Sequence, residues 1–156
     1  MTAQSPSSAG AYALAEAAEQ AASALQDNLK RARESMAWLI GQLAALPGCR
    51  ILPEPRLDLR QAEGYSPFIL SAAFPPLPAE VLVRVMGQEG FLISTGAACS
   101  SRKRERTRVL EAMGIGRELA SSAVRISFGP STERGELARF VEALRRRLPE
   151  LLGGRR

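Results

Sequence analysis

The chain has 156 residues, of which 46% are hydrophobic, and its formal net charge is +5 at pH 7. This size and apolar content predict one compact domain, and no apolar run approaches the roughly 20 residues of a membrane-spanning helix. Two cysteines and no histidine exclude a His-based metal site and any Cys-His or Ser-His catalytic pair within the chain. Residues 1–10 lack the features of a secretory signal, so we expect a soluble protein of the reducing cytoplasm.

The N-terminal part of the chain predicts one long amphipathic helix from Ala9 to Leu46. Its apolar side chains recur at steps of three and four, which places them on one helical face. They are Leu14, Ala18, Ala21, Leu25, Leu29, Ala32, Met36, Leu39, Leu43 and Leu46. Because a helix this long resembles a connector, we expect residues 1–47 to form a leading segment and residues 48–156 a small domain.

Shorter elements are predicted in the middle of the chain. In order they are a strand over Cys49–Leu52, a strand over Phe68–Phe74, a helix from Pro78 to about Glu89, and a strand over Phe91–Ser94. Gly90 is expected to cap this helix. Its inward face is predicted to consist of Val81, Leu82, Val85 and Met86.

The last third predicts a short helix, a strand and a final helix. The short helix covers Thr107–Met113, and the strand Ala123–Phe128 alternates apolar with polar side chains. Ser131 is expected to cap the last helix, with Glu133 in its first turn. The apolar stripe of that helix is Leu137, Phe140, Val141, Leu144 and Leu148. Together these elements predict an α+β fold with helices packed on a small sheet.

Cys99 is the first candidate for chemistry. It lies in a predicted loop over residues 94–106, among small residues and just before a run of basic ones. Positive charge nearby lowers the pKa of a thiol and favours the nucleophilic thiolate. The alternative is that Cys99 is a small buried residue, as free cysteines often are. For Cys49, which begins a predicted strand, we expect only this packing role.

Arg125 is the second candidate, because it interrupts the apolar residues of a predicted strand. A guanidinium in this position is costly to bury unless it meets a carboxylate, which it can bind with two parallel hydrogen bonds. A structural ion pair or exposure on a sheet face would explain it equally well.

Basic residues are concentrated in Arg102–Arg108 and in a C-terminal tail with Arg145, Arg146, Arg147, Arg155 and Arg156. Such patches can attract nucleic acid, but stacking on single strands needs aromatic side chains, and the first run has none. We therefore expect solvated helix faces and, at most, weak and salt-dependent binding of nucleic acid.

Three stretches follow one another in the second half of the chain: Phe91 to Ser101 (FLISTGAACSS), Val109 to Gly114 (VLEAMG) and Val124 to Gly129 (VRISFG). In this order they resemble the cysteine desulfurases, pyridoxal-phosphate enzymes of the class V aminotransferase-like family, in their branch with a long catalytic loop. The segment Ser66 to Leu70 (SPFIL) and the residues from Phe74 to Leu82 are also similar to that family.

The resemblance implies a fold and a set of roles. The chain would be the small C-terminal domain of a fold-type-I pyridoxal-phosphate enzyme, preceded by its connecting helix. Cys99 would attack the sulfur of substrate cysteine and become a persulfide, with release of alanine, and Arg125 would clamp the substrate carboxylate. The loop would swing out to deliver the sulfur. Thr2 matches a threonine that contacts the cofactor phosphate of the partner subunit.

Most of the cofactor site has no counterpart in this sequence. The two lysines, Lys30 and Lys103, lie in the long helix and in the basic loop, and neither suits a Schiff base. The expected partners are therefore a cofactor-binding large domain or its separate polypeptide, and a sulfur acceptor for iron–sulfur cluster or RNA thiolation pathways, either a scaffold or a thiolation enzyme. A homodimer is a further expected partner. The alternative function is a stand-alone, non-catalytic persulfide carrier or docking module.

Overall fold

The computed structural model describes residues 8–58, 60, 64–95 and 108–153. The helices and strands in these ranges follow one another in nearly the predicted order. They are α1 (Ser8–Ala44), β1 (Arg50–Leu52), the 3-10 helix η1 (Glu54–Leu57), β2 (Ile69–Ala73), α2 (Ala79–Gln88), β3 (Ser94–Thr95), α4 (Arg108–Ala112), α5 (Arg117–Ser122), β4 (Ala123–Ser127) and α6 (Arg134–Gly153). The predicted fold class is confirmed.

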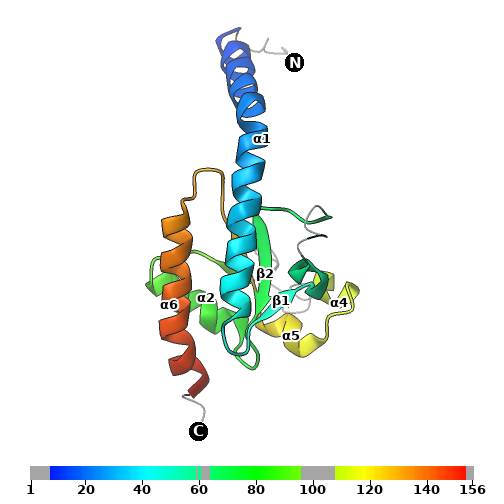
Figure 1. Cartoon of the computed structure of the whole chain (residues 1–156), viewed down its shortest axis with the longest axis vertical. Helices are drawn as coiled ribbons and strands as arrows, with labels where there is room; N and C mark the ends of the chain where they lie inside the picture. Colours follow the sequence, from blue (N-terminus) through cyan, green and yellow to red (C-terminus); the bar gives the residue numbers. More distant parts are fainter. Residues whose placement is uncertain (1–7, 59, 61–63, 96–107, 154–156) are drawn as a thin grey trace, which may run out of the picture.

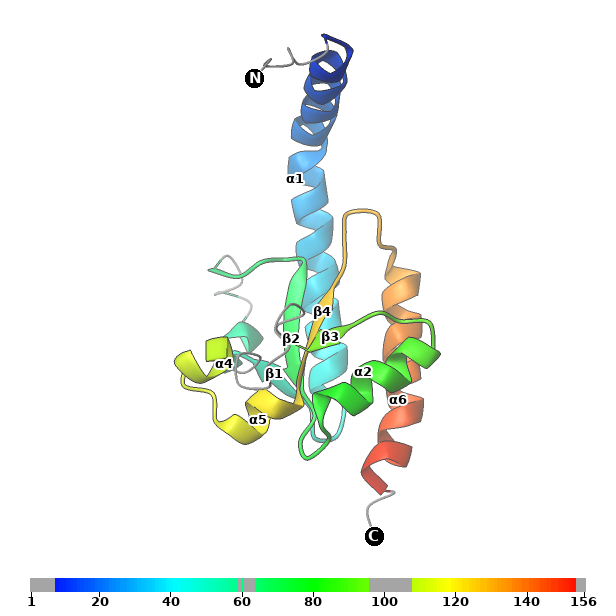
Figure 2. The same cartoon turned by 180° about the vertical axis from the view of Figure 1, so that it is seen from behind.

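Within the described residues the strands form one antiparallel sheet in the order β1-β2-β4-β3. The main core lies on one face of it, where α1, α2 and α6 pack on side chains such as Leu70 and Ile126. Figures 1 and 2 show α1 on this side, in front of β2 in one view and behind the strands in the other. A smaller cluster on the opposite face joins Leu52, Ala73 and Ala123 to side chains near α4 and α5.

The long helix forms as predicted, but only its second half is buried. Its apolar stripe enters the core from Ala32 onward, whereas Leu14 is 72% exposed and Leu25 is 49% exposed. The periodicity is local to the helix, while burial requires a neighbouring surface. The sheet and α6 cover only the C-terminal half, and the N-terminal half projects beyond the body of the molecule (Figure 1).

Two predicted elements begin elsewhere than expected. The strand predicted over Phe91–Ser94 is instead Ser94–Thr95, and Leu92 is 93% exposed. The last helix begins at Arg134, so Ser131 is not its cap. The Glu136 carboxylate accepts a hydrogen bond from the backbone N–H of Glu133 at 2.9 Å. A side chain of the helix itself thus provides an acceptor for a backbone N–H at the helix start.

Smaller differences concern α2 and α5. Val81 was expected to face inward but is exposed, while Val83 packs against the core beside the buried Leu82 and Met86. The helix α5 was not predicted at all. Gly90 and Gly114 have φ angles of 85° and 79°, the left-handed conformation that ends a helix, which agrees with the capping role predicted for Gly90.

The asymmetric burial of α1 predicts unequal effects of the same substitution at two positions. Leu39 is fully buried in the main core, so Leu39→Ala should lower the free energy of unfolding by about 2–5 kcal/mol. Leu14→Ala, on the projecting half, should change it by no more than about 0.5 kcal/mol. Equilibrium denaturation in urea measures both variants. A large loss for Leu14→Ala would show that the projecting half is covered in solution.

Candidate functional site

Arg125 lies at the middle of β4, between β2 and β3. Its backbone is paired in register with Ser71 on one side and Ser94 on the other. Side chains at paired positions of neighbouring strands share a face of the sheet, so these three residues form a polar row across it. Arg125 is half-buried in this row.

The alternation predicted for this strand is confirmed and explains the orientation of the row. Val124 and Ile126 point into the main core and are buried, and Ser127 is exposed. Arg125 therefore lies on the face opposite the main core. The cluster near α4 and α5 covers this face beside Ala123, two residues before Arg125. A guanidinium held there by regular strand pairing can receive a carboxylate without disturbing the core.

The elements on either side of the segment that carries Cys99 both adjoin this face of the sheet. Its predicted loop, residues 94–106, lies outside the described residues from 96 onward, as does Thr2. The described chain leaves β3 at Thr95, which is paired with Val124, and resumes at α4. Leu110 of α4 packs against the Leu52, Ala73 and Ala123 cluster. Residues 96–107 thus connect two elements that both adjoin the Arg125 face.

Cys49 has the packing role expected of it. It is partly buried against the main core, just before β1. Burial raises the pKa of its thiol to about 12, from an ordinary value of 9.0. A thiol with so high a pKa is almost entirely protonated at neutral pH and is a poor nucleophile.

The described residues do not fit a pyridoxal-phosphate site. Lys30 is exposed on α1, remote from the polar row in sequence and on a different element, and Lys103 lies outside the described residues. Within the described ranges, acids and Cys49 form no cluster suited to a metal ion, and no helix is long and apolar enough to cross a membrane. Within the described ranges, no lysine is therefore placed to form a Schiff base beside the polar row.

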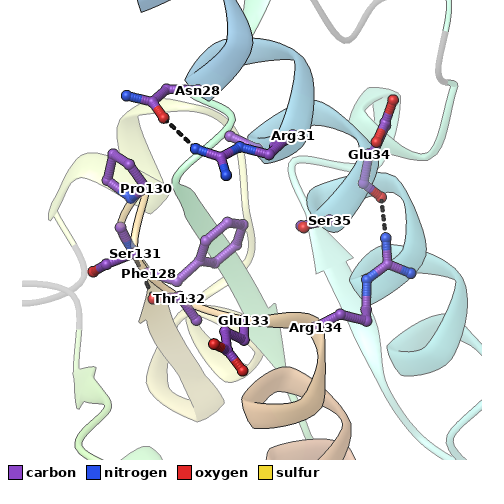
Figure 3. A pocket seen from close by; sticks show the side chains of 12 residues that line it. Asn28, Arg31, Glu34, Ser35, Phe128, Pro130, Ser131, Thr132, Glu133 and Arg134 are labelled. Carbon is purple, nitrogen blue, oxygen red and sulfur yellow. Dashed lines mark hydrogen bonds between the residues drawn. The ribbon is translucent and has the colours of Figure 1, made fainter. Parts of the chain in front are cut away.

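Sequence reasoning missed an open cleft of about 640 Å³ between α1 and the loop that joins β4 to α6 (Figure 3). On its α1 side, Arg31 donates a hydrogen bond to the side-chain oxygen of Asn28 at 2.6 Å. On the other side, Arg134 reaches the backbone oxygen of Glu34 at 3.4 Å. Glu34 and Glu133 balance the two arginines, so the lining does not select a charged ligand. The Gly129-Pro130-Ser131 turn is the sequence signal that could have indicated this loop.

Three arginines of the basic tail make contacts on the surface of the domain, and Arg155 and Arg156 lie outside the described residues. Arg146 and Arg147 both pair with Glu89 at the end of α2, and the Arg147 Nε to Glu89 Oε1 distance is 2.6 Å. These contacts hold the pKa of the Glu89 carboxyl below its ordinary value, the largest cause being the hydrogen bond from Arg147. Arg145 donates to Gln42 at 2.6 Å. Because these guanidinium groups are paired with side chains of the domain, we interpret this part of the basic tail as a solvated helix face and not as a nucleic-acid surface.

Comparison with known sequences relates the chain to one family of enzymes. The family model for aminotransferase class-V proteins matches residues 1–140. A cysteine desulfurase of Rhodobacter capsulatus is 31% identical over 135 residues, which are 86% of this chain and 33% of that protein. The cysteine desulfurase IscS of Buchnera aphidicola is 35% identical over 94 residues, 60% of this chain and 22% of that protein.

Solved structures show the same relation at the level of the fold. A NifS-like protein superposes with a TM-score of 0.73 at 25% identity, over 96% of this chain and 35% of its own. The cysteine desulfurase CsdA of Escherichia coli superposes with a TM-score of 0.67 at 21% identity, over 97% of this chain and 33% of its own. The chain therefore spans about a third, or less, of the length of these similar proteins.

Proposed function

Since the chain belongs to the aminotransferase class-V family, we propose that it is the part of a cysteine desulfurase that carries the sulfur-accepting cysteine, Cys99, and the substrate-binding arginine, Arg125. The position of Arg125 is the observation on which this proposal mainly rests. It lies in a polar row with Ser94 of β3, the strand that directly precedes the Cys99 segment.

Arg125 is proposed to bind the carboxylate of substrate L-cysteine. A guanidinium can donate two parallel hydrogen bonds to a carboxylate, which fixes both the position and the orientation of the amino acid. The paired backbones of β2 and β3 hold β4 in place on both sides, so Arg125 extends from a rigid element. This rigidity favours a positioning role, because little freedom is lost when the substrate binds.

Cys99 is proposed to take the sulfur atom. Cys99 lies four positions after Thr95, and an extended chain spans at most about 14 Å over four positions, which keeps Cys99 within reach of the Arg125 face. Basic residues from Arg102 onward favour its thiolate form. In the net reaction, the Cys99 thiol gains one sulfur as a persulfide, and L-cysteine loses that sulfur and becomes L-alanine.

Pyridoxal phosphate, when bound, supplies the electron sink that allows the carbon–sulfur bond of cysteine to break. Because the described residues do not fit that cofactor, we assign its binding to the remaining two-thirds of such an enzyme, with Thr2 as a contact from this chain to the cofactor phosphate. The projecting half of α1 supports such a partner, since it exposes Tyr12, Leu14 and Leu25.

The proposal extends to the fate of the sulfur. We propose a cytoplasmic role in which Cys99 passes its persulfide sulfur to an acceptor protein, a scaffold or a thiolation enzyme, of iron–sulfur cluster or RNA thiolation pathways. A homodimer would bring Thr2 of one copy to the site of the other, as the resemblance implies.

A complementation assay tests this function. The chain is mixed with a separately produced cofactor-binding domain from a cysteine desulfurase, and alanine released from L-cysteine is measured. We expect alanine from the mixture and none from this chain alone. The function is contradicted if the two associate and the mixture releases no more alanine than the cofactor domain does by itself. Persulfide gained by the chain alone from a small donor, without any alanine release in the mixture, would favour the carrier function instead.

A further inference from the structure

A shallow groove lies between α1 and α6, the two helices that run side by side in Figures 1 and 2. Its volume is about 350 Å³. We call it the Trp38 groove, and its lining residues are Trp38 and Gln42 of α1 and Ala138, Arg139, Val141, Glu142 and Arg145 of α6. Its lining shares no residue with that of the open cleft beside the loop between β4 and α6.

Three arginines of α6 border this groove, and none of them pairs with a carboxylate in the described part of the chain. Arg134 lies over the indole of Trp38, with its guanidinium carbon 4.9 Å from the ring centre. Arg145 donates to a neutral amide oxygen, that of Gln42. Arg139 is exposed and has no hydrogen-bond acceptor among the described residues.

Their positive charge is therefore not compensated as it is elsewhere on the same helix. Arg146 and Arg147 both pair with the carboxylate of Glu89, whereas a neutral amide or an aromatic ring leaves the full charge of a guanidinium in place. Glu142 is the one carboxylate in the lining, and it forms no ion pair within the described residues. Three guanidinium groups and one carboxylate leave the groove with an excess of positive charge.

Trp38 gives the groove a rigid apolar centre. Its ring is half-buried and packs against the main core, so its position is fixed before any partner arrives. The exposed Ala138 lies beside it in the lining and adds little bulk. Tryptophan and arginine are the residue types that contribute most often to binding energy at protein interfaces.

We propose that the Trp38 groove binds an acidic segment of a partner protein. An apolar side chain of that segment packs on Trp38 and Ala138, and its carboxylates pair with Arg139 and Arg145. A nucleic-acid strand fits less well, because Glu142 interrupts the basic lining and only one aromatic ring is present for stacking. Since α1 and α6 pack on the sheet face opposite Arg125, this surface is independent of the proposed function.

Tryptophan fluorescence tests the proposal, because Trp38 is the only tryptophan of the chain. The whole chain is titrated with a short acetylated peptide of glutamate, aspartate and leucine, which has no aromatic side chain. We expect a saturable change in Trp38 emission, and binding that weakens as the ionic strength rises. A control peptide with glutamine and asparagine in place of the acids should bind about tenfold more weakly.

Substitutions of exposed arginines locate the binding surface without disturbing the core. Arg139→Gln should weaken binding of the acidic peptide about three- to fivefold, and Arg139→Gln combined with Arg145→Gln about tenfold. Arg117→Gln is the matched control, since Arg117 is an exposed arginine of α5, which packs on the opposite face of the sheet. It should leave binding unchanged.

The proposal is overturned if the acidic peptide leaves the Trp38 emission unaltered, or if the neutral peptide binds equally well. Tighter binding of a single-stranded oligothymidylate of equal charge would identify a nucleic-acid surface instead. Alanine release in the complemented mixture should continue when the acidic peptide is present. If the peptide stopped it, the groove would belong to the contact with the cofactor-binding domain and not to a separate partner.

Discussion

Cys99→Ser is expected to abolish sulfur transfer in the complemented assembly, whereas Cys49→Ser should leave it unchanged. A serine hydroxyl cannot hold the transferred sulfur as a persulfide, so no turnover through this residue is possible. The matched change at Cys49 removes the other thiol of the chain, which is partly buried and has a pKa of about 12. Mass spectrometry of the protein after incubation with L-cysteine should find the additional sulfur on the peptide of Cys99.

The same contrast should be visible in the chain by itself, through alkylation with iodoacetamide as a function of pH. The Cys49 thiol, whose pKa is raised from 9.0 to about 12, should react about a thousandfold more slowly at pH 8 than an ordinary thiol, because only the thiolate reacts. Its rate should still rise with pH well above pH 9. Cys99 should react fast, with a midpoint at or below the ordinary thiol pKa.

Two outcomes would contradict this account. If desulfurase activity persisted in Cys99→Ser, the sulfur would not pass through this residue. If Cys99 resisted alkylation in the folded chain as strongly as Cys49 does, its thiol would be buried, and the proposed transfer would have no accessible nucleophile. The activity assay uses Cys49→Ser as the background. Alkylation of Cys99 is followed in Cys49→Ser and alkylation of Cys49 in Cys99→Ser, so that a single thiol reacts in each variant.

Arg125→Lys is expected to lower kcat/KM for L-cysteine by about 10- to 100-fold, mainly through KM. Lysine keeps the positive charge but cannot donate two parallel hydrogen bonds to a carboxylate. Arg50→Lys is the matched control, since Arg50 is an exposed arginine on β1 of the same sheet, and its kinetics should not change.

Separate measurement of kcat and KM for Arg125→Lys distinguishes substrate binding by Arg125 from a merely structural role. A structural role for Arg125 would lower the free energy of unfolding and the amount of active protein, leaving KM unaltered. Substrate binding by Arg125 predicts instead a raised KM, with nearly unchanged stability in urea, and a smaller loss for cysteamine, which lacks the carboxylate. Equal losses for cysteine and cysteamine would refute the carboxylate contact.

Much of this molecule is determined by local patterns that the sequence displays. The steps of three and four in α1 and α6 and the alternation in β4 are properties of a single helix or strand, so they could be recognised without knowing any neighbour. For the same reason the sequence was sufficient to place Arg125 on the face opposite Val124 and Ile126. The class-V resemblance likewise depends on residues that are contiguous in the chain, and the family match confirms it.

Burial, in contrast, was decided by the tertiary structure, because it depends on which surfaces meet. The apolar stripe of α1 also runs through the half of the helix that precedes Ala32. The sheet and α6 do not cover that half, so Leu14 and Leu25 stay exposed. The six-residue helix α5 has too little length for a periodic signal, and it forms where its Leu119 packs against Leu52, Ala73 and Ala123 of the sheet. The polar row at Arg125 required the pairing of three strands that are distant in sequence. Arg56 lies in a charged, proline-rich stretch whose composition predicts exposure. It is buried because α1 and the turn at residues 65–67 lie beside it.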